Sequence, residues 1–178
     1  MKRFFTTKRL CRAGVIAALY VALTYAFAPL AFGPFQVRPA EAFCILPVFF
    51  PEAIPALYIG CMISNLASPY LVYDVFIGSL ATLFAAFASY MVGAFLKKEP
   101  LCCILSGFFP ILFNALIIPF IIVFLCGGAE GYKTAITAYF TFMGSIALTE
   151  AVWVYGLGTP LYFTMKRLQK NNTHGLFQ

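Results

Sequence analysis

The sequence predicts an all-α integral membrane protein: a bundle of six transmembrane helices whose second and third helices form a short, broken pair. Of the 178 residues, 62% are hydrophobic and 10% are charged, and the mean hydropathy is +0.91. Soluble domains carry about 25% charged residues, so this chain has too little charge to cover a soluble surface. Its apolar residues form separate long runs, and ten of its twelve basic residues lie in three short segments beside those runs.

The three basic segments predict the topology. They are residues 1–12, residues 97–98 and residues 166–170. Short basic segments beside membrane spans stay in the cytoplasm, so all three should share the cytoplasmic side, with both termini inside. The net charge of +6 then reflects orientation in a membrane rather than a surface for nucleic acid.

The first apolar run covers residues 13–31. Its 19 or so residues are enough to span a bilayer, which needs about 20, so we interpret it as a retained first helix rather than a cleaved signal peptide. Residues 1–12 are then a basic cytoplasmic N-terminus, residues 13–168 the six-helix transmembrane domain, and residues 169–178 a flexible tail.

The region from residue 43 to residue 67 contains three prolines, Pro47, Pro51 and Pro55. If it were one span, the basic pair at 97–98 would lie outside. Proline cannot continue the hydrogen-bond ladder of a helix, so residues 50–52 are predicted to form a turn between two short helices. As an α-helix of about ten residues, the second helix would rise only about 15 Å. A five-span arrangement is the alternative.

The remaining spans follow from the apolar runs. Residues 71–96 form the fourth span and residues 101–125 the fifth. A glycine-rich break at 126–131 should lie outside, and a long run then reaches Met165. That run exceeds one straight span of about 20 residues, so residues 132–139 should lie in the outer loop or extend the helix beyond the bilayer.

Polar and ionisable residues inside this bundle are the candidates for function, because such groups are costly at membrane depth and usually face a cavity or a partner. On the six-span topology they fall in the outer half and could converge on one outward-facing pocket. Local ion pairs and interhelical hydrogen bonds are the structural alternative. The principal candidates are Arg38, Glu41, Asn65, Asp74, Asn114 and Glu150.

The first span has small residues spaced four apart, a pattern that lets another backbone approach closely. The pairs are Ala13/Ala17, Gly14/Ala18 and Ala18/Ala22. They could serve internal packing or contact with a partner subunit. The six cysteines show no metal-ligand spacing, and we interpret them as small apolar packing residues.

No nucleotide-binding, metalloprotease or serine-hydrolase motif occurs in the chain. We therefore expect no catalytic residues, no metal and no cofactor bound by this chain. A pocket without an energy source of its own suggests a substrate-binding subunit that other proteins drive.

Four stretches resemble one known family: residues 32–42, 54–65, 76–82 and 113–118. Together they are similar to the queuosine-precursor transporter (QueT) family, which are substrate-binding (S) components of energy-coupling factor (ECF) transporters. The resemblance implies six helices in a prokaryotic cell membrane. It also implies two kinds of partner, a transmembrane coupling subunit (EcfT) and two cytoplasmic ATPases that use the ATP. Ala13/Ala17 is the favoured match to the small-residue contact with the coupling subunit, and Ala18/Ala22 fits the same spacing equally well.

The implied mechanism is toppling, in which the loaded subunit tilts and presents its pocket inward. The implied ligand is a queuosine precursor or queuine, with a 7-deazaguanine ring. Glu150 or Glu41 could accept the two donors of the ring edge, and Asp74 or the second glutamate could pair with an exocyclic amine. The ring carbonyl needs a donor, from Asn65, Asn114 or Arg38. Aromatic faces could come from Phe35, Tyr73 and Trp153, and Gln36 lies in the same loop as Phe35.

Two other functions stay open. The chain could be an S component or stand-alone carrier for another vitamin-like or purine-like molecule, or a membrane scaffold subunit that transports nothing. Which precursor is preferred, and whether the energising module is dedicated or shared, does not follow from the residues.

Overall fold

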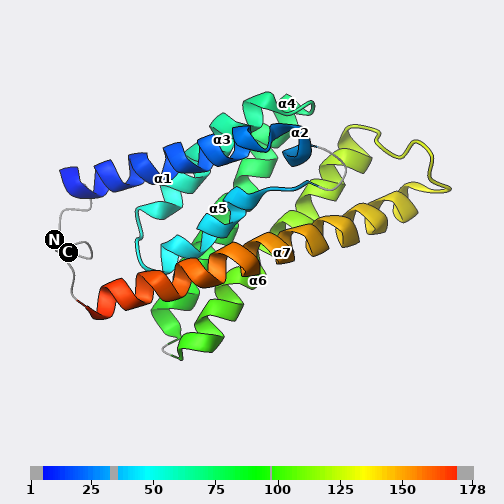
Figure 1. The fold of residues 1–178 in the computed structure, drawn as a ribbon. Coiled ribbons are helices and arrows are strands. Elements are labelled where there is room, and N and C mark those ends of the chain that lie inside the picture. The colour runs from blue at the N-terminus through cyan, green and yellow to red at the C-terminus, as the bar shows by residue number, and fades with distance from the viewer. Residues whose placement is uncertain (1–5, 33–35, 97, 172–178) are drawn as a thin grey trace.

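The computed structural model describes residues 6–32, 36–96 and 98–171, and within these ranges the chain is helical with short connections (Figure 1). The elements in chain order are α1 (Thr7–Ala26), α2 (Ala28–Ala31), η1 (Pro39–Val48), α3 (Ala53–Ser64), η2 (Asn65–Ala67), α4 (Leu71–Tyr73), η3 (Asp74–Gly78), α5 (Ser79–Phe95), α6 (Glu99–Phe120), η4 (Ile121–Leu125) and α7 (Ala135–Lys170). Here η1 and η2 are 3-10 helices, and η3 and η4 are π-helical turns.

Four segments are long and apolar enough to cross a membrane: Thr7–Ala26, Leu71–Phe95, Glu99–Leu125 and Ala135–Lys170. Two shorter apolar helices, Pro39–Val48 and Ala53–Ala67, accompany them. Large apolar side chains point outward along the long helices, with Phe95 75% and Leu148 70% exposed. This arrangement fits a helical bundle in lipid, and the count of six crossings stays a prediction.

The predicted turn in the proline-rich region is present. Residues 49–52 separate η1 from α3, and Glu52 is the residue that precedes the first turn of α3. Glu52 also pairs with Arg12 of α1 at 2.8 Å, and the Arg12 guanidinium lies 4.3 Å from the centre of the Phe50 ring. These contacts join the start of α1 to the turn.

The predicted length of the second helix was wrong because it assumed α-helical geometry. The segment is a 3-10 helix of 10 residues with Pro47 inside it. A 3-10 helix rises about 2.0 Å per residue, so η1 spans about 20 Å instead of about 15 Å. A proline removes an amide donor from the ladder, and a narrow, extended helix is consistent with that loss.

The centre of the bundle is η1. It packs against α1, α3, α5, α6 and α7, and eight of its ten residues are buried. The close approach of α5 depends on Gly93, where an added Cβ would lie 2.9 Å from Val48 Cγ1 and 3.0 Å from Val48 Cα. Surrounded in this way, η1 does not need to satisfy its backbone against lipid.

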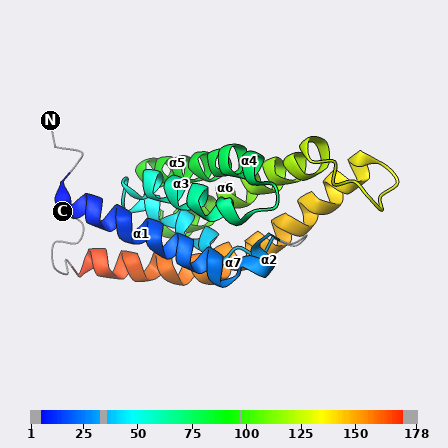
Figure 2. The same ribbon diagram turned by 90° about the horizontal axis from the view of Figure 1, so that it is seen from above.

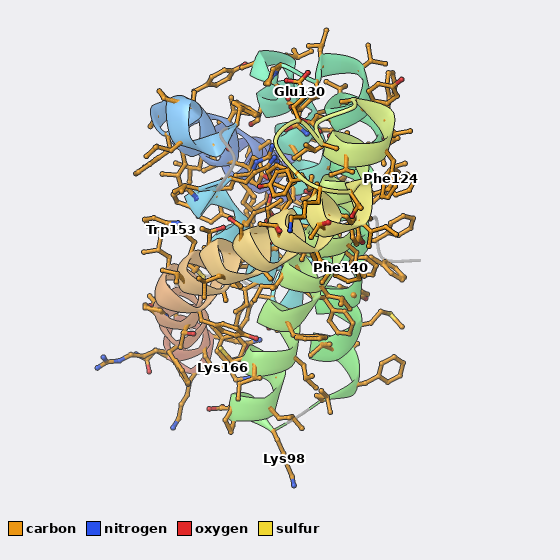
Figure 3. The ribbon with its side chains drawn as sticks, turned by 90° about the vertical axis from the view of Figure 1, so that its right-hand side faces the viewer. Lys98, Phe124, Glu130, Phe140, Trp153 and Lys166 are labelled. Carbon is orange, nitrogen blue, oxygen red and sulfur yellow. The ribbon has the colours of Figure 1, made fainter. Side chains whose placement is uncertain are left out.

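The two ends of the bundle differ in charge. The start of α1 and the end of α7 lie at the same end (Figure 1), and the two helices run along the same side of the molecule (Figure 2). Lys98 and Lys166 lie at one end and Glu130 near the other (Figure 3). The 36 residues of α7 measure about 54 Å at 1.5 Å per residue, so this helix extends beyond a single membrane thickness.

Candidate functional site

Nine of the ten predicted ligand residues lie in the described part of the chain, and Phe35 lies outside it. Seven are buried, namely Gln36, Arg38, Glu41, Asn65, Asp74, Asn114 and Glu150. Six of these, all except Gln36, form what we call the polar cluster: Arg38, Glu41, Asn65, Asp74, Asn114 and Glu150. The cluster joins residues that are distant in sequence, from η1, η2, η3, α6 and α7 and from the residue before η1.

Each carboxylate oxygen of Glu41 accepts a hydrogen bond from another side chain. The Tyr20 hydroxyl of α1 donates to its Oε1 at 2.5 Å, and the Cys44 thiol one turn along η1 donates to its Oε2 at 3.2 Å. Glu41 and Cys44 are 0% exposed and Tyr20 is 1% exposed. Both carboxylate oxygens therefore already have internal donors, so Glu41 is less available to a ligand than its sequence position indicates.

Arg38 precedes η1 and is 3% exposed. Its Nε donates to the carbonyl of Ala31 at 3.3 Å, and its guanidinium carbon lies 5.3 Å from the centre of the Phe32 ring. It is within electrostatic range of Glu41 and Asp74. One of its terminal nitrogens, Nη2, is buried without a hydrogen-bond partner among the described residues.

Asn65 and Asp74 meet where α3 ends and η3 begins. The Asn65 amide donates to the backbone carbonyl of Asp74 at 2.7 Å, and the Ser68 hydroxyl donates to Asp74 Oδ2. Two acceptors remain, since Asn65 Oδ1 and Asp74 Oδ1 are buried without a donor among the described residues. Gly78 packs closely against both side chains, because an added Cβ would lie 3.3 Å from Asn65 Nδ2 and 3.7 Å from Asp74 Oδ1.

Asn114 of α6 and Glu150 of α7 form the third part of the cluster. The Asn114 amide donates to Glu150 Oε1 at 2.7 Å, and Glu150 Oε2 is buried without a donor in the described chain. Glu150 is also within electrostatic range of Glu41 and Arg38. The pair thus places the Asn114 amide next to a carboxylate whose second oxygen, Glu150 Oε2, has no donor among the described residues.

The remaining predicted residues lie differently. Tyr73 is 40% exposed on α4 and does not join the buried cluster. Trp153 is half-buried on α7, with its ring 6.1 Å from that of Phe27 (Figure 3). Gln36 is buried with φ of 45°, a left-handed conformation that is uncommon outside glycine. These three positions stay predictions for ligand contact.

Tyr70 and Cys126 lie near Asp74 from two different loops. Both are partly buried and within electrostatic range of that carboxyl group. Partial burial raises the pKa of the Tyr70 hydroxyl and of the Cys126 thiol. Both groups therefore stay protonated at neutral pH, and they border the cluster as uncharged groups.

Sequence reasoning missed the side chains that support the cluster. Tyr20, Cys44 and Ser68 donate to its carboxylates, and Cys61 accepts from Asn65 and Thr82 at 3.4 and 3.3 Å. The interpretation of the cysteines as purely apolar packing was therefore incomplete. A tyrosine in the middle of an apolar span was the available signal, because a buried hydroxyl needs a partner.

Tyr20→Phe should destabilise the protein by about 1–3 kcal/mol, because it leaves a buried carboxylate oxygen without its donor. The measurement is the thermal unfolding midpoint of the purified protein. Tyr25→Phe is the control on the same helix, since its exposed hydroxyl donates to Ile63 at 3.2 Å. An equal shift in both variants would show that the Tyr20–Glu41 bond has no special role.

The small residues of α1 divide into two faces. Ala13 and Ala17 are half-buried, pack against the core and line a groove of about 440 Å³ between α1 and α3. Gly14 and Ala18 are exposed, and an added Cβ at Gly14 would meet nothing within 4 Å. Ala13/Ala17 thus contributes to packing inside the protein, while Gly14/Ala18 and Ala18/Ala22 are both exposed, and Gly14 also lines the groove.

The chemistry of the cluster follows from its unpaired atoms. Among the described residues they are one donor nitrogen on Arg38 and three acceptor oxygens, on Asn65, Asp74 and Glu150. Buried polar groups are normally hydrogen-bonded, and a small polar molecule is one group that could satisfy these four unpaired atoms. That molecule should offer several donors and at least one acceptor.

Comparison with known proteins supplies a family. The model of the family described as QueT transporter matches residues 10–167. A curated protein of Lactococcus lactis subsp. cremoris (strain MG1363), Queuosine precursor transporter QueT, is 41% identical over 71 residues. That match covers 39% of this chain and 41% of the relative. No solved structure matches.

Proposed function

Because the chain belongs to the QueT transporter family, a family of multi-pass membrane transporters, we propose that it takes up a queuosine precursor across the cell membrane. In this proposal it is the substrate-binding subunit of an ATP-driven importer of the ECF type. The name of the Lactococcus lactis relative supports the ligand class. The buried polar cluster supports a binding role for this chain.

The observation that carries the proposal is the match between the unpaired atoms and a 7-deazaguanine ring. The ring edge presents adjacent N–H donors, which a carboxylate can accept together. Glu150, with Oε2 unpaired and Asn114 beside it, suits that edge better than Glu41, whose oxygens are taken by Tyr20 and Cys44. Arg38 Nη2 is the unpaired donor for the ring carbonyl.

The proposed topology has six crossings with both termini in the cytoplasm. It is supported by the grouping of Lys98 and Lys166 at one end of the molecule, since basic segments stay on the cytoplasmic side (Figure 3). Arg38, Asp74 and Glu41 then lie toward the outer half. Because the cluster is buried, ligand entry requires the segments around it to open. The loaded subunit would then topple to release the ligand inside.

The energy in this proposal comes from partner subunits. The chain has no nucleotide-binding motif, so ATP would be hydrolysed by two cytoplasmic ATPases joined through the transmembrane coupling subunit. The exposed pair Gly14/Ala18 and the adjoining groove on α1 are the proposed contact, because small residues let helices approach closely in a membrane. Neither ATP nor another cofactor would bind to this chain.

Gly14→Leu should reduce recovery of the coupling subunit and ATPases in a pull-down by about tenfold or more, as for a residue at the centre of an interface. Nothing lies within 4 Å of the new Cβ, so the internal packing should be kept. Gly144→Leu on α7 is the matched control, since Gly144 is also exposed and open. If Gly14→Leu and wild type recover the partners equally, this contact face is wrong.

The transport proposal is tested by uptake into proteoliposomes. The chain is reconstituted with and without the coupling subunit and ATPases, and uptake of a labelled 7-deazaguanine is measured with and without internal ATP. We expect accumulation only when the partners and ATP are both present. Uptake by the chain alone without ATP would identify a stand-alone carrier, and no uptake under any condition would contradict transport.

A further inference from the structure

Acidic side chains outnumber basic ones in the polar cluster. Arg38 is its only cationic side chain, while Glu41, Asp74 and Glu150 are carboxyl groups, and all four are at most 3% exposed. Arg38 is within electrostatic range of Glu41, Asp74 and Glu150. Burying a charge without a partner is costly, so a cationic group from the ligand would complete the cluster.

The internal hydrogen bonds show which carboxylate is left for that group. Glu41 accepts from Tyr20 and Cys44, so both of its oxygens have donors. Glu150 lies beside Asn114 and suits the planar ring edge. Asp74 uses only Oδ2, which accepts from Ser68, and its Oδ1 is buried without a donor in the described chain.

The surroundings of Asp74 hold two unpaired acceptors. Gly78, one turn along the same helical segment, packs closely against both side chains, because an added Cβ would lie 3.3 Å from Asn65 Nδ2 and 3.7 Å from Asp74 Oδ1. Asn65 Oδ1 is the second unpaired acceptor, and the Asn65 amide nitrogen contacts the backbone oxygen of Asp74 at 2.7 Å. Two unpaired acceptors with no donor of their own suit an ammonium group, which has three donors and no acceptor.

We propose that the site selects a 7-deazaguanine whose 7-substituent carries a protonated amine, with Asp74 as the counter-ion of that amine and Asn65 Oδ1 as its second acceptor. This inference rests on the proposed function and adds to it a preference among precursors. A ligand with an uncharged 7-substituent would leave Asp74 Oδ1 unpaired, and so would bind more weakly.

The test compares two ligands that differ only at this group, 7-aminomethyl-7-deazaguanine and 7-cyano-7-deazaguanine. Equilibrium binding to purified wild-type protein should favour the aminomethyl ligand by at least about tenfold, the order expected for one charge-assisted hydrogen bond. In Asp74→Asn this preference should fall toward one. Ser68→Ala removes a neutral donor from Asp74 and should reduce the preference less.

Glu130→Gln is the charge control, because Glu130 is exposed on a loop at the end of the molecule opposite Lys98 and Lys166 (Figure 3). It should leave the ligand preference unchanged. An equal loss in Glu130→Gln and Asp74→Asn would show long-range attraction instead of a subsite and would overturn the inference.

The outcomes separate this inference from the proposed function. Equal binding of both ligands to wild type overturns the amine subsite alone, and so does an unchanged preference in Asp74→Asn. If neither ligand binds, the proposed function fails and the inference fails with it. Should Asp74→Asn not fold, the wild-type preference and its change in Ser68→Ala still decide the question.

Discussion

Glu150→Gln is expected to weaken binding of a 7-deazaguanine by about 10- to 100-fold. A hydrogen bond to a charged group contributes about 1.5–3 kcal/mol, and each 1.4 kcal/mol or so is a factor of ten. Glutamine keeps the size of the side chain but offers an amide where a ring N–H needs a carboxylate oxygen. The affinity is measured by calorimetry on the purified protein.

The matched control for Glu150→Gln is Glu130→Gln, the same chemical change on an exposed loop residue. It should leave the affinity within about twofold of wild type, because exposed charges are well screened. Unchanged affinity in Glu150→Gln would show that Glu150 does not accept the N–H donors of the ring edge. Glu41 would then be the candidate for that contact.

Arg38→Met is expected to destabilise the protein by about 1–3 kcal/mol, the cost of leaving a buried acceptor, here the Ala31 carbonyl, without its donor. Arg38 is 3% exposed and is the cationic side chain within range of Glu41, Asp74 and Glu150. Its loss leaves three buried carboxyl groups without compensation. The readout is the thermal unfolding midpoint in detergent.

Arg167→Met is the control for Arg38→Met, because Arg167 is exposed near the end of α7 and should shift the stability by less than about 0.5 kcal/mol. Arg38→Lys should fall between the two, since it keeps the charge but loses the fork that donates to Ala31. If Arg38→Met is as stable as wild type, Arg38 is not needed to compensate the carboxylates.

Much of the fold was predictable because charge and proline have direct physical meaning in a membrane chain. Requiring the basic segments at 1–12 and 97–98 to share one side predicted that the region around Pro51 turns, and the turn at residues 49–52 is present. The 3-10 geometry of η1 and the π-helical turn at Asp74 were not predictable. Both depend on packing against other helices, which local sequence does not encode.

The membership of the polar cluster was predictable residue by residue, since ionisable groups are rare at membrane depth. Its wiring was not. Tyr20 and Glu41 are 21 positions apart and Asn114 and Glu150 are 36 apart, so the donors that occupy each carboxylate appear only in three dimensions. These hydrogen bonds change which carboxylate is the candidate for ligand binding. Both oxygens of Glu41 have internal donors, while Glu150 and Asp74 each keep an unpaired oxygen.

The choice among the small-residue pairs of α1 also could not be made from the sequence. Three small-residue pairs with the same spacing cannot be ranked from sequence, because each satisfies the requirement for close approach equally. The structure sets one pair apart by orientation: Ala17 lies against α3, where an added Cβ at Gly60 would be 3.2 Å from its carbonyl oxygen, while Gly14, Ala18 and Ala22 are exposed. The proposed contact therefore uses the exposed residues in place of Ala13/Ala17, and Gly14 is the position that tests it.

We propose that the buried polar cluster of this QueT family member binds a 7-deazaguanine. Equilibrium binding of 7-deazaguanines to the purified wild-type protein, with guanine and folate as controls, tests this most directly. We expect tight binding of a 7-deazaguanine whose 7-substituent carries an amine. Guanine and folate share the amino and oxo groups of the ring edge but lack that amine, so they should bind at least about tenfold more weakly, the cost of one unmade charged hydrogen bond. Equal binding of guanine or folate, or no binding of any 7-deazaguanine, would contradict it.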